Sequence, residues 1–314
     1  MNTKLKKRCL LIGGAGFIGT KLACNLRDNG YDISICDYME QEKLSTSILD
    51  VPYMSLNYFT EELSDEFLSE QDMVVLLISS VAPNSSMQQP ESCYGKDIVR
   101  MIELLEQMRR CKVNQLVFIS SGGTIYGNQD AKAYKEDMET SPINHYGIMK
   151  LTQEKILLMY NTLYGMENII FRLANPYGEG QRTSSGVGAV TAFLDNIINN
   201  HKIIIYGKGE VIRDYIYIAD AVEMMRRCLD NNGSAVAVPV FNIGTGQGNS
   251  LMQIVEAMEA IVGEKAQIEF KSARKIDVKR NVLDISKVLS VIGDYQCRTL
   301  TEGIKEYYNI KKGR

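Results

Sequence analysis

The stretch RCLLIGGAGFIGTK, residues 8–21, decides the fold of this chain. An apolar run at 8–12 is followed by four glycines between positions 13 and 19, and then by apolar residues at helical spacing as far as Gly30. A strand, a glycine turn and a helix N-terminus in this order bring backbone N–H groups close to a phosphate. The sequence therefore predicts a phosphate-binding turn near its N-terminus.

Two kinds of protein use such a turn. A nucleoside-triphosphate P-loop needs Gly, four residues and then Gly-Lys-Ser/Thr, but Thr20 stands where the lysine is required and Lys21 comes one place late. Gly14, Gly16 and Gly19 instead satisfy the dinucleotide pattern G-x-G-x-x-G, and Gly13, Gly16 and Gly19 satisfy the related G-x-x-G-x-x-G. The turn is predicted to bind a dinucleotide.

An acidic residue ends the second predicted strand, at 31–37. Asp37 stands 24 residues after Gly13, where a carboxylate bonds the adenosine ribose 2′-hydroxyl. Because a carboxylate repels a 2′-phosphate, NAD is favoured over NADP. The alternative is that Asp37 only caps its strand.

Composition is typical of an ordinary soluble enzyme. The chain has 314 residues and a formal net charge of −3, which gives no electrostatic case for nucleic acid or an anionic membrane as partner. No run approaches the ~20 apolar residues of a membrane span. Seven scattered cysteines without C-x-x-C predict reduced thiols in the cytoplasm, and two histidines exclude a histidine metal cluster, so no metal site is expected.

Predicted strands at 72–80, 114–121 and 168–176 alternate with predicted helices at 96–111 and 144–165. This alternation predicts a Rossmann-like, doubly wound parallel α/β sheet with helices on both faces. Regularity loosens after 176, with a helix at 188–200 and the strand IIIYG at 203–207. We expect a dinucleotide-binding domain at 1–176, rejoined by a strand near 241–246, and a smaller α/β substrate domain at 177–314.

Chemistry is expected from Tyr146 and Lys150, which are i and i+4 on one predicted helix face. Tyrosine titrates near pH ~10, and a neighbouring ammonium stabilises the phenolate, which makes it a usable base. The Ser/Thr-rich stretch SSGGTIYG, 120–127, precedes them. An ordinary half-buried tyrosine beside a solvated lysine remains the alternative.

The chain resembles the extended short-chain dehydrogenase/reductases, in particular the nucleotide-sugar epimerase and dehydratase branch typified by UDP-glucose 4-epimerase. The matching pieces follow the family order over nearly the whole length: GGAGFIG (13–19), Asp37, SSGGTIYG, YGIMK (146–150), RLANPYGEGQ (172–181), RDYIYIAD (213–220), FNIGTG (241–246) and NVLDISK (281–287).

The resemblance implies roles for individual residues. Tyr146 would be the acid/base, Lys150 would hold the nicotinamide ribose and lower the tyrosine pKa, and Ser121, with Thr124 as substitute, would share the proton of the sugar O4. NAD would be bound by Gly13, Gly16, Phe17, Ile18, Gly19, Asp37, Leu77, Ser79, Tyr146, Lys150 and Leu173. The nucleotide sugar would be bound by Asn175, Tyr206, Arg213, Tyr215, Arg274 and Asp277.

Three positions depart from the family pattern. Counting from LVF places the catalytic hydroxyl at Ser121, whereas counting back from YG lands on Gly122. The family's Asn in N-V-x-G-T is Asp97 here, and the Asp after the third strand is Asn57. These changes weaken the adenine-side assignments more than the catalytic ones.

The resemblance implies an NAD-dependent 4-epimerase that acts on a UDP-hexose or UDP-N-acetylhexosamine through a 4-keto sugar. A 4-ketoreductase, a 4,6-dehydratase and a catalytically silent NAD-binding module are the alternatives. A dehydratase carries an Asp-Glu pair where Gly123 and Thr124 stand. The helices at 96–111 and 146–162 would form the interface of a homodimer, although each could equally be covered by its own domain.

Overall fold

The computed structural model describes residues 6–39, 44–182, 188–273 and 278–313. Its contacts divide the chain into two compact units. The first unit is Met1–Ser120, His145–Phe171 and Met225–Val240, and the second is Ser121–Asn144, Arg172–Met224 and Phe241–Arg314. The sequence predicts that a dinucleotide-binding domain ends at residue 176 and that a substrate-binding domain follows it. The division into compact units does not say which ligand each part binds, so this boundary stays a prediction.

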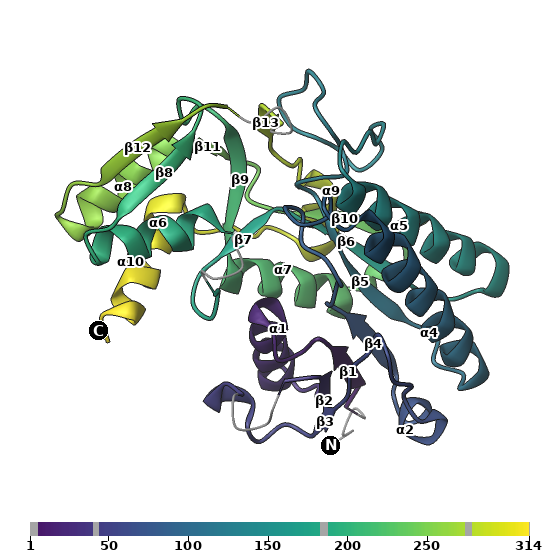
Figure 1. Ribbon diagram of the computed structural model, residues 1–314. Helices are drawn as coiled ribbons and strands as arrows, with labels where there is room; N and C mark the ends of the chain where they lie inside the picture. Colours follow the sequence, from purple (N-terminus) through teal and green to yellow (C-terminus); the bar gives the residue numbers. More distant parts are fainter. Residues whose placement is uncertain (1–5, 40–43, 183–187, 274–277, 314) are drawn as a thin grey trace. The chain divides into compact units, whose positions relative to one another are not determined.

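A seven-stranded sheet has the order β3-β2-β1-β4-β5-β6-β10 (Figure 1). Its strands are β1 (Arg8–Ile12), β2 (Asp32–Asp37), β3 (Tyr53–Ser55), β4 (Met73–Leu76), β5 (Leu116–Ser121), β6 (Ile169–Leu173) and β10 (Val240–Ile243). The pairs β1–β2, β2–β3, β1–β4 and β4–β5 are parallel. The chain reverses its direction of travel across the sheet between β1 and β4, which is where such sheets bind ligands. The predicted Rossmann-like fold is confirmed.

Helices of the first unit pack against this sheet. They are α1 (Phe17–Asp28), α2 (Asp65–Ser69), α3 (Pro90–Ser92), α4 (Val99–Arg110) and α5 (His145–Tyr164), with a π-helical turn η3 (Cys93–Ile98) and the 3-10 turns η2 (Thr46–Ile48) and η5 (Gly233–Ala235). Helix α7 (Ile218–Asp230) runs from the second unit into the first.

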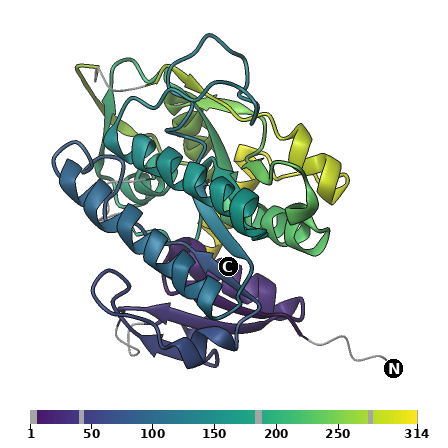
Figure 2. The ribbon, with the colours of Figure 1, turned by 90° about the vertical axis from the view of Figure 1, so that its right-hand side faces the viewer.

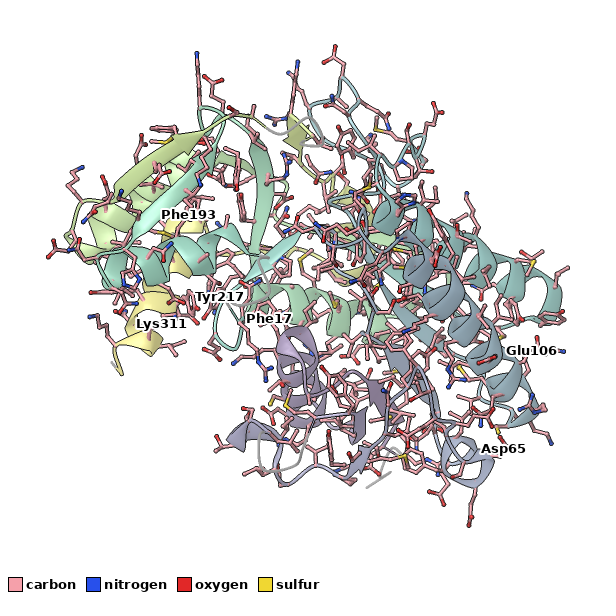
Figure 3. The ribbon with its side chains drawn as sticks, viewed as in Figure 1. Phe17, Asp65, Glu106, Phe193, Tyr217 and Lys311 are labelled. Carbon is pink, nitrogen blue, oxygen red and sulfur yellow. The ribbon has the colours of Figure 1, made fainter. Side chains whose placement is uncertain are left out.

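Helices α4 and α5 lie side by side, as Figures 1 and 2 both show. Leu105 and Met108 of α4 and Leu157 of α5 are fully buried in one apolar core with strand residues of the sheet. The Tyr160 hydroxyl donates a hydrogen bond of 2.6 Å to Glu106, which is labelled in Figure 3. The paired helices thus fix the C-terminal half of α5 on the first unit.

The second unit contains smaller sheets. Its strands are β7 (Asn175–Tyr177), β8 (Lys202–Tyr206), β9 (Ile212–Tyr217), β11 (Gly248–Ser250), β12 (Gln267–Lys271) and β13 (Arg280–Asn281), and its helices are α6 (Ala189–Ile198), α8 (Leu251–Val262), α9 (Ser286–Ile292) and α10 (Leu300–Lys311). β9 pairs with β11, β13 and β7, and β12 pairs with β8. Phe193 and Tyr217, labelled in Figure 3, belong to its core.

Three predicted elements differ from the structure. The strand expected at 168–176 is wrong as a single element: it breaks at Ala174, and β7 pairs with β9 at an edge that tolerates Pro176. The helix expected from 96 has its α-helical part only from Val99, because a π turn precedes it. β4 ends at Leu76 rather than 80, which leaves the following residues as a loop.

No helix of the described part of the chain combines the length and the apolar character needed to cross a membrane.

Candidate active site

The glycine turn follows β1 directly. Gly13 has a φ of +83°, in the region that favours glycine. A Cβ on Gly19 would lie 2.5 Å from the Gly13 carbonyl oxygen and 2.6 Å from the Gly14 Cα. The tight turn therefore requires glycine at both positions for its own geometry.

Gly16 is different, and its surroundings test the fit to a dinucleotide. The nearest heavy atom to a Cβ at Gly16 would be 3.4 Å away, so the packing of the chain itself does not demand glycine there. Gly16 is also the N-cap of α1 and supplies no side-chain cap to the first-turn N–H groups that begin at Phe17, labelled in Figure 3, and Ile18. An open cradle beside uncapped N–H groups fits a pyrophosphate.

Asp37 ends β2 beside this turn and is only 7% exposed. Its carboxylate accepts hydrogen bonds from the backbone N–H of Ala15 at 3.0 Å and of Tyr38 at 2.8 Å. Asp37 therefore braces the glycine turn in addition to ending its strand. A carboxylate has about four acceptor positions, so capacity remains for a ribose hydroxyl.

The loop after β4 carries Leu77 and Ser79. The Leu77 N–H donates to Ile12 at 3.0 Å and so continues the β1–β4 pairing beyond the strand. The Ser79 hydroxyl donates to Asp97 at 2.9 Å, which leaves the serine oxygen as an acceptor on the loop. Both residues follow the carboxyl end of β4, at the reversal of strand order where a dinucleotide is expected.

Lys150 and Tyr146 share the first turns of α5, as predicted. Lys150 is 3% exposed, and its Nζ donates to the backbone carbonyl of Ile119 in β5 at 3.1 Å. The same Nζ lies 4.5 Å from the centre of the Phe118 ring and 5.6 Å from that of Tyr146. The lysine is thus built into the unit, which rules out the alternative of a solvated side chain.

Burial changes how both groups titrate. It lowers the pKa of Lys150 to about 8, against the opposing effect of Asp97 and Glu154. Burial also raises the pKa of Tyr146, and Asp97 and Cys93 add to that increase. In the chain by itself the net effect on the pKa of Tyr146 is thus an increase, and the lowering expected from Lys150 stays a prediction. A further positive charge nearby would favour the phenolate, and the nicotinamide ring of oxidised NAD carries one.

In the second unit, the segment with the candidate hydroxyls is pinned from two sides. The Gly122 N–H donates to the Leu173 carbonyl at 2.8 Å, and the Asn281 amide donates to the Gly122 carbonyl at 2.9 Å. The Oγ1 atom of Thr124 is buried and has no partner among the described residues, whereas Ser121 is the last residue of β5. This hydroxyl makes Thr124, the expected substitute, the stronger candidate of the two.

Three predicted substrate residues come together on β7 and β9. Asn175 is paired in register with Tyr215, and its amide donates to the Asp214 carbonyl at 2.9 Å. Arg213 and Tyr215 project from the same face of β9. The Arg213 Nη1 donates to the carbonyls of Ile212 at 2.9 Å and Val278 at 2.5 Å.

Tyr206 is the last residue of β8, and Arg274 and Asp277 lie outside the described residues. Sequence reasoning missed Asp214, whose buried carboxylate accepts from the Thr245 N–H at 2.9 Å and the Thr245 hydroxyl at 2.7 Å. The sequence did carry a signal for this pair of residues, because Asp214 follows Arg213 in the motif RDYIYIAD and Thr245 lies in the motif FNIGTG.

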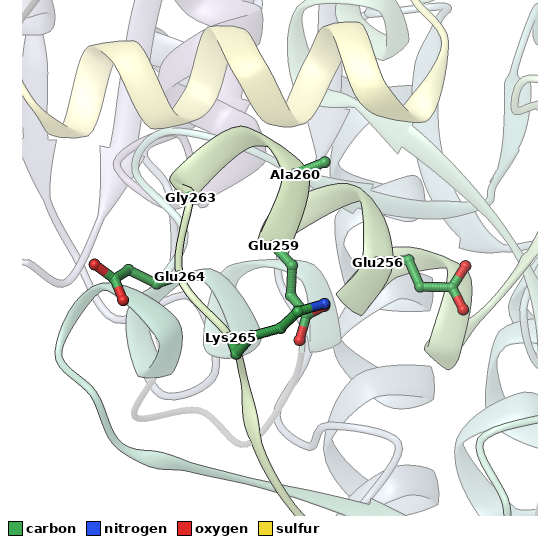
Figure 4. Close-up of a pocket in the computed structure, with 6 residues that line it drawn as sticks. All are labelled: Glu256, Glu259, Ala260, Gly263, Glu264 and Lys265. Atoms are coloured by element: carbon green, nitrogen blue, oxygen red, sulfur yellow. The ribbon is translucent and has the colours of Figure 1, made fainter.

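A hollow of about 450 Å³ lies at the C-terminal end of α8 (Figure 4). It contains none of the predicted site residues. Its lining is dominated by solvent-facing charge, and consists of Glu256, Glu259, Ala260, Gly263, Glu264 and Lys265. The candidate residues are therefore those after β1, β2 and β4 and on α5 in the first unit, and those on β7 and β9 in the second unit, and none of them lines this hollow.

Comparison with known proteins agrees with this geometry. The model of the NAD-dependent epimerase/dehydratase family matches residues 9–244. A Methanocaldococcus jannaschii protein provisionally named UDP-glucose 4-epimerase is 30% identical over 96% of this chain and 98% of its own length. The Escherichia coli dTDP-4-dehydro-6-deoxyglucose reductase is 29% identical over 95% of this chain and 96% of its own length.

Among solved structures, the Thermotoga maritima UDP-glucose 4-epimerase with UDP-glucose is 28% identical, with a TM-score of 0.85 over 97% of this chain and 99% of that chain. The dinucleotide turn, the Tyr146–Lys150 pair and these similarities lead to one conclusion. The chain belongs to the NAD-dependent epimerase/dehydratase family, in the nucleotide-sugar branch of the extended short-chain dehydrogenase/reductases, and its cofactor is NAD.

Proposed function

We propose that the protein is a nucleotide-sugar 4-epimerase, acting on a UDP-hexose or a UDP-N-acetylhexosamine through a transient 4-keto sugar. The observation that carries the proposal is the buried Lys150, fixed on the Ile119 carbonyl one helical turn from Tyr146. This pair stands in the unit that also holds the dinucleotide turn. The similarity to UDP-glucose 4-epimerases supports it.

Each residue has a task in the proposed reaction. Tyr146 takes the proton of the sugar 4-hydroxyl and later returns it, and the hydroxyl of Thr124 or Ser121 shares that proton. Lys150 orients the nicotinamide ribose and stabilises the phenolate. NAD would be held by the glycine turn, Asp37 and Lys150, and would supply a hydride acceptor and donor for C4 of the sugar that is restored at each turnover.

Binding tasks divide along the chain. We assign the dinucleotide to 1–176 and the nucleotide sugar to 177–314, where Asn175 borders the second segment and Arg213, Tyr215, Tyr206, Arg274 and Asp277 lie within it. A guanidinium such as that of Arg213 binds phosphate oxygens in a planar fork and would hold the diphosphate while the sugar turns about it.

The test is incubation of the purified protein with UDP-glucose or UDP-N-acetylglucosamine, without added cofactor, followed by chromatographic separation of the 4-epimers. Because the cofactor is restored in each cycle, the proposed enzyme forms the epimer from cofactor that stays bound. Conversion that requires stoichiometric reduced cofactor and a 4-keto substrate would instead identify a 4-ketoreductase.

The ketoreductase is the second candidate, because the 29% identical Escherichia coli relative is named as a reductase of a 4-keto nucleotide sugar. A 4,6-dehydratase is less well supported, since Gly123 and Thr124 stand where an Asp-Glu pair would be needed. In the same assay a dehydratase accumulates a 4-keto-6-deoxy sugar. A silent NAD-binding module leaves every substrate unchanged.

A homodimer through α4 and α5 is also proposed. Each helix exposes large apolar side chains: Val99 and Ile102 on α4, and Met159 and Leu163 on α5, with Leu163 63% exposed. Light scattering of the wild-type protein should give twice the mass of one chain. The variant Leu163→Lys, which puts a charge on the proposed interface, should give the mass of one chain. A wild-type monomer at micromolar concentration would contradict the proposal.

Cytoplasmic localisation likewise stays a prediction. All seven cysteines are free thiols, in keeping with a reducing compartment.

A further inference from the structure

Asp97 is a buried carboxylate with an unusual setting. It lies in the π-helical turn before α4 and is 3% exposed. Its carboxylate accepts hydrogen bonds from the Ser79 hydroxyl at 2.9 Å, from the Ser80 N–H at 3.0 Å and from the Ser80 hydroxyl. Three donors suit a group that only accepts hydrogen bonds, as an ionised carboxylate does. Asp97 therefore ties the π turn to the loop after β4.

The π turn also packs on α5. A small buried cluster is formed by Val81, by Cys93 of the turn and by Met149 of α5, and Tyr146 packs against it. The Gln153 amide, one turn beyond Met149, donates to the Asp97 backbone carbonyl at 3.2 Å. One residue thus connects the loop predicted to contact NAD with the helix that carries the catalytic pair.

The charged and titratable neighbours among the described residues of the first unit come from three segments. Tyr58, which is buried in the segment after β3, has its pKa raised by burial and by Asp97. From η3 they are Cys93 and Tyr94, and from α5 they are His145, Lys150 and Glu154. β5 contributes the Phe118 ring and the Ile119 carbonyl to Lys150, but no ionisable side chain. Asp97 raises the pKa of Tyr146 and also that of Lys150, whereas Glu154 acts on Lys150 without acting on Tyr146.

We propose that Asp97 is a positioning residue of the catalytic pair: it holds the loop after β4 through Ser79 and Ser80, and its negative charge sets the pH range in which Tyr146 and Lys150 work together. The proposal rests on the proposed function only for its effect on turnover. An amide at this position would keep the shape of the site but would move its working range toward lower pH.

The sign follows from the charges. A carboxylate near Tyr146 disfavours the phenolate, so the acid limb of the rate profile, where the base must be deprotonated, lies higher with Asp97 than without it. The same carboxylate favours the Lys150 ammonium, so the alkaline limb also lies higher. Asp97→Asn is expected to move both limbs to lower pH, by about one unit each.

Glu154→Gln is the matched control, because it replaces another buried carboxylate, which lies on α5 with Tyr146 and Lys150 and accepts a hydrogen bond from the Ser120 hydroxyl at 2.6 Å. It should move the alkaline limb alone. Asp97→Glu, which keeps the charge, should retain both limbs near those of the wild type. If Asp97→Asn does not fold, as judged by circular dichroism, Asp97→Ser supplies a second neutral and smaller side chain for the same comparison.

A second readout does not depend on turnover. Tyrosinate ultraviolet absorbance is followed against pH for the NAD complex, and the difference between Tyr146-containing and Tyr146→Phe proteins isolates Tyr146. The Tyr146 transition should occur at lower pH in Asp97→Asn than in the wild type. That shift, in a protein without epimerase activity, would support the role of Asp97 and overturn the proposed function. An unmoved transition and an unmoved acid limb would overturn the role of Asp97.

Discussion

The ammonium of Lys150 donates a hydrogen bond to the backbone carbonyl of Ile119, 3.1 Å away, and so joins α5 to β5, the strand that pairs with β4. This contact keeps a charged group inside the unit, 5.6 Å from the Tyr146 ring centre. Burying this ammonium reduces the free energy of unfolding, because the charge is no longer hydrated. A group held at such a cost is a strong candidate for function.

The first prediction concerns Tyr146. Tyr146→Phe removes the ionisable oxygen and keeps the ring, so epimerisation should fall by about 10²-fold or more. NAD affinity, measured by calorimetric titration, should be largely retained, because the pyrophosphate rests on the glycine turn. Tyr164→Phe removes a hydroxyl at the far end of the same helix and should leave turnover unchanged. Near-normal turnover of Tyr146→Phe would show that another group moves the proton.

The second prediction concerns the titration of Lys150. With its pKa near 8, turnover should decline as pH rises through about 8, where the ammonium is lost.

The free energy of unfolding should rise over the pH range in which turnover falls. Between pH 8 and 10.5 the unfolded chain binds the Lys150 proton and the folded chain does not, so the free energy of unfolding rises with pH in that window. The rise should be about 3 kcal/mol at most, taken as the difference between wild type and Lys150→Met in urea unfolding. Parallel curves for the two proteins would mean that Lys150 titrates at its ordinary pKa.

The third prediction concerns cofactor choice. Asp37 should make NAD bind far better than NADP, and Asp37→Asn should narrow the gap while still accepting the Ala15 N–H. Asp37→Ala should narrow it too, with an added loss of stability of about 1–3 kcal/mol from the unpaired N–H. Asp32→Asn, at the exposed start of the same strand, is the control for net charge. Equal affinities for NAD and NADP in the wild type would remove the role of Asp37.

The fourth prediction separates the two hydroxyls. Thr124→Val preserves shape and removes a buried hydroxyl without a described partner, so the free energy of unfolding should stay unchanged or increase. Turnover should fall by about tenfold or more, since a proton-sharing group is lost. Ser121→Ala should have the smaller effect on turnover. The reverse order of the two variants would return the role to Ser121.

The fifth prediction concerns the nucleotide sugar. A charged hydrogen bond contributes about 1.5–3 kcal/mol, so Arg213→Ala should weaken UDP binding by about tenfold to a hundredfold and leave NAD binding unchanged. The same is expected of Arg274→Ala. Arg110→Ala, at the exposed end of α4, is the arginine control. Unchanged UDP affinity in both Arg213→Ala and Arg274→Ala would argue against a nucleotide-sugar substrate while leaving the dinucleotide turn in place.

Local patterns predicted much of the first unit. The glycine spacing, the apolar strand residues and the helix that ends before Gly30 all depend on neighbours in sequence, and the structure has β1, α1 and β2 where the patterns place them. The strand that breaks at Ala174 could not be foreseen, because its second half is determined by pairing with β9, far along the chain.

The sequence alone determined the family, the cofactor and the i, i+4 placement of Tyr146 and Lys150, since each depends on residue types at short, fixed spacing. Only the tertiary structure decided the electrostatics. Burial, together with Asp97 from a different helix, raises the tyrosine pKa that the lysine alone was expected to lower. The reason is physical: a charge responds to the water it loses and to neighbours brought close by folding, and neither is encoded in local spacing.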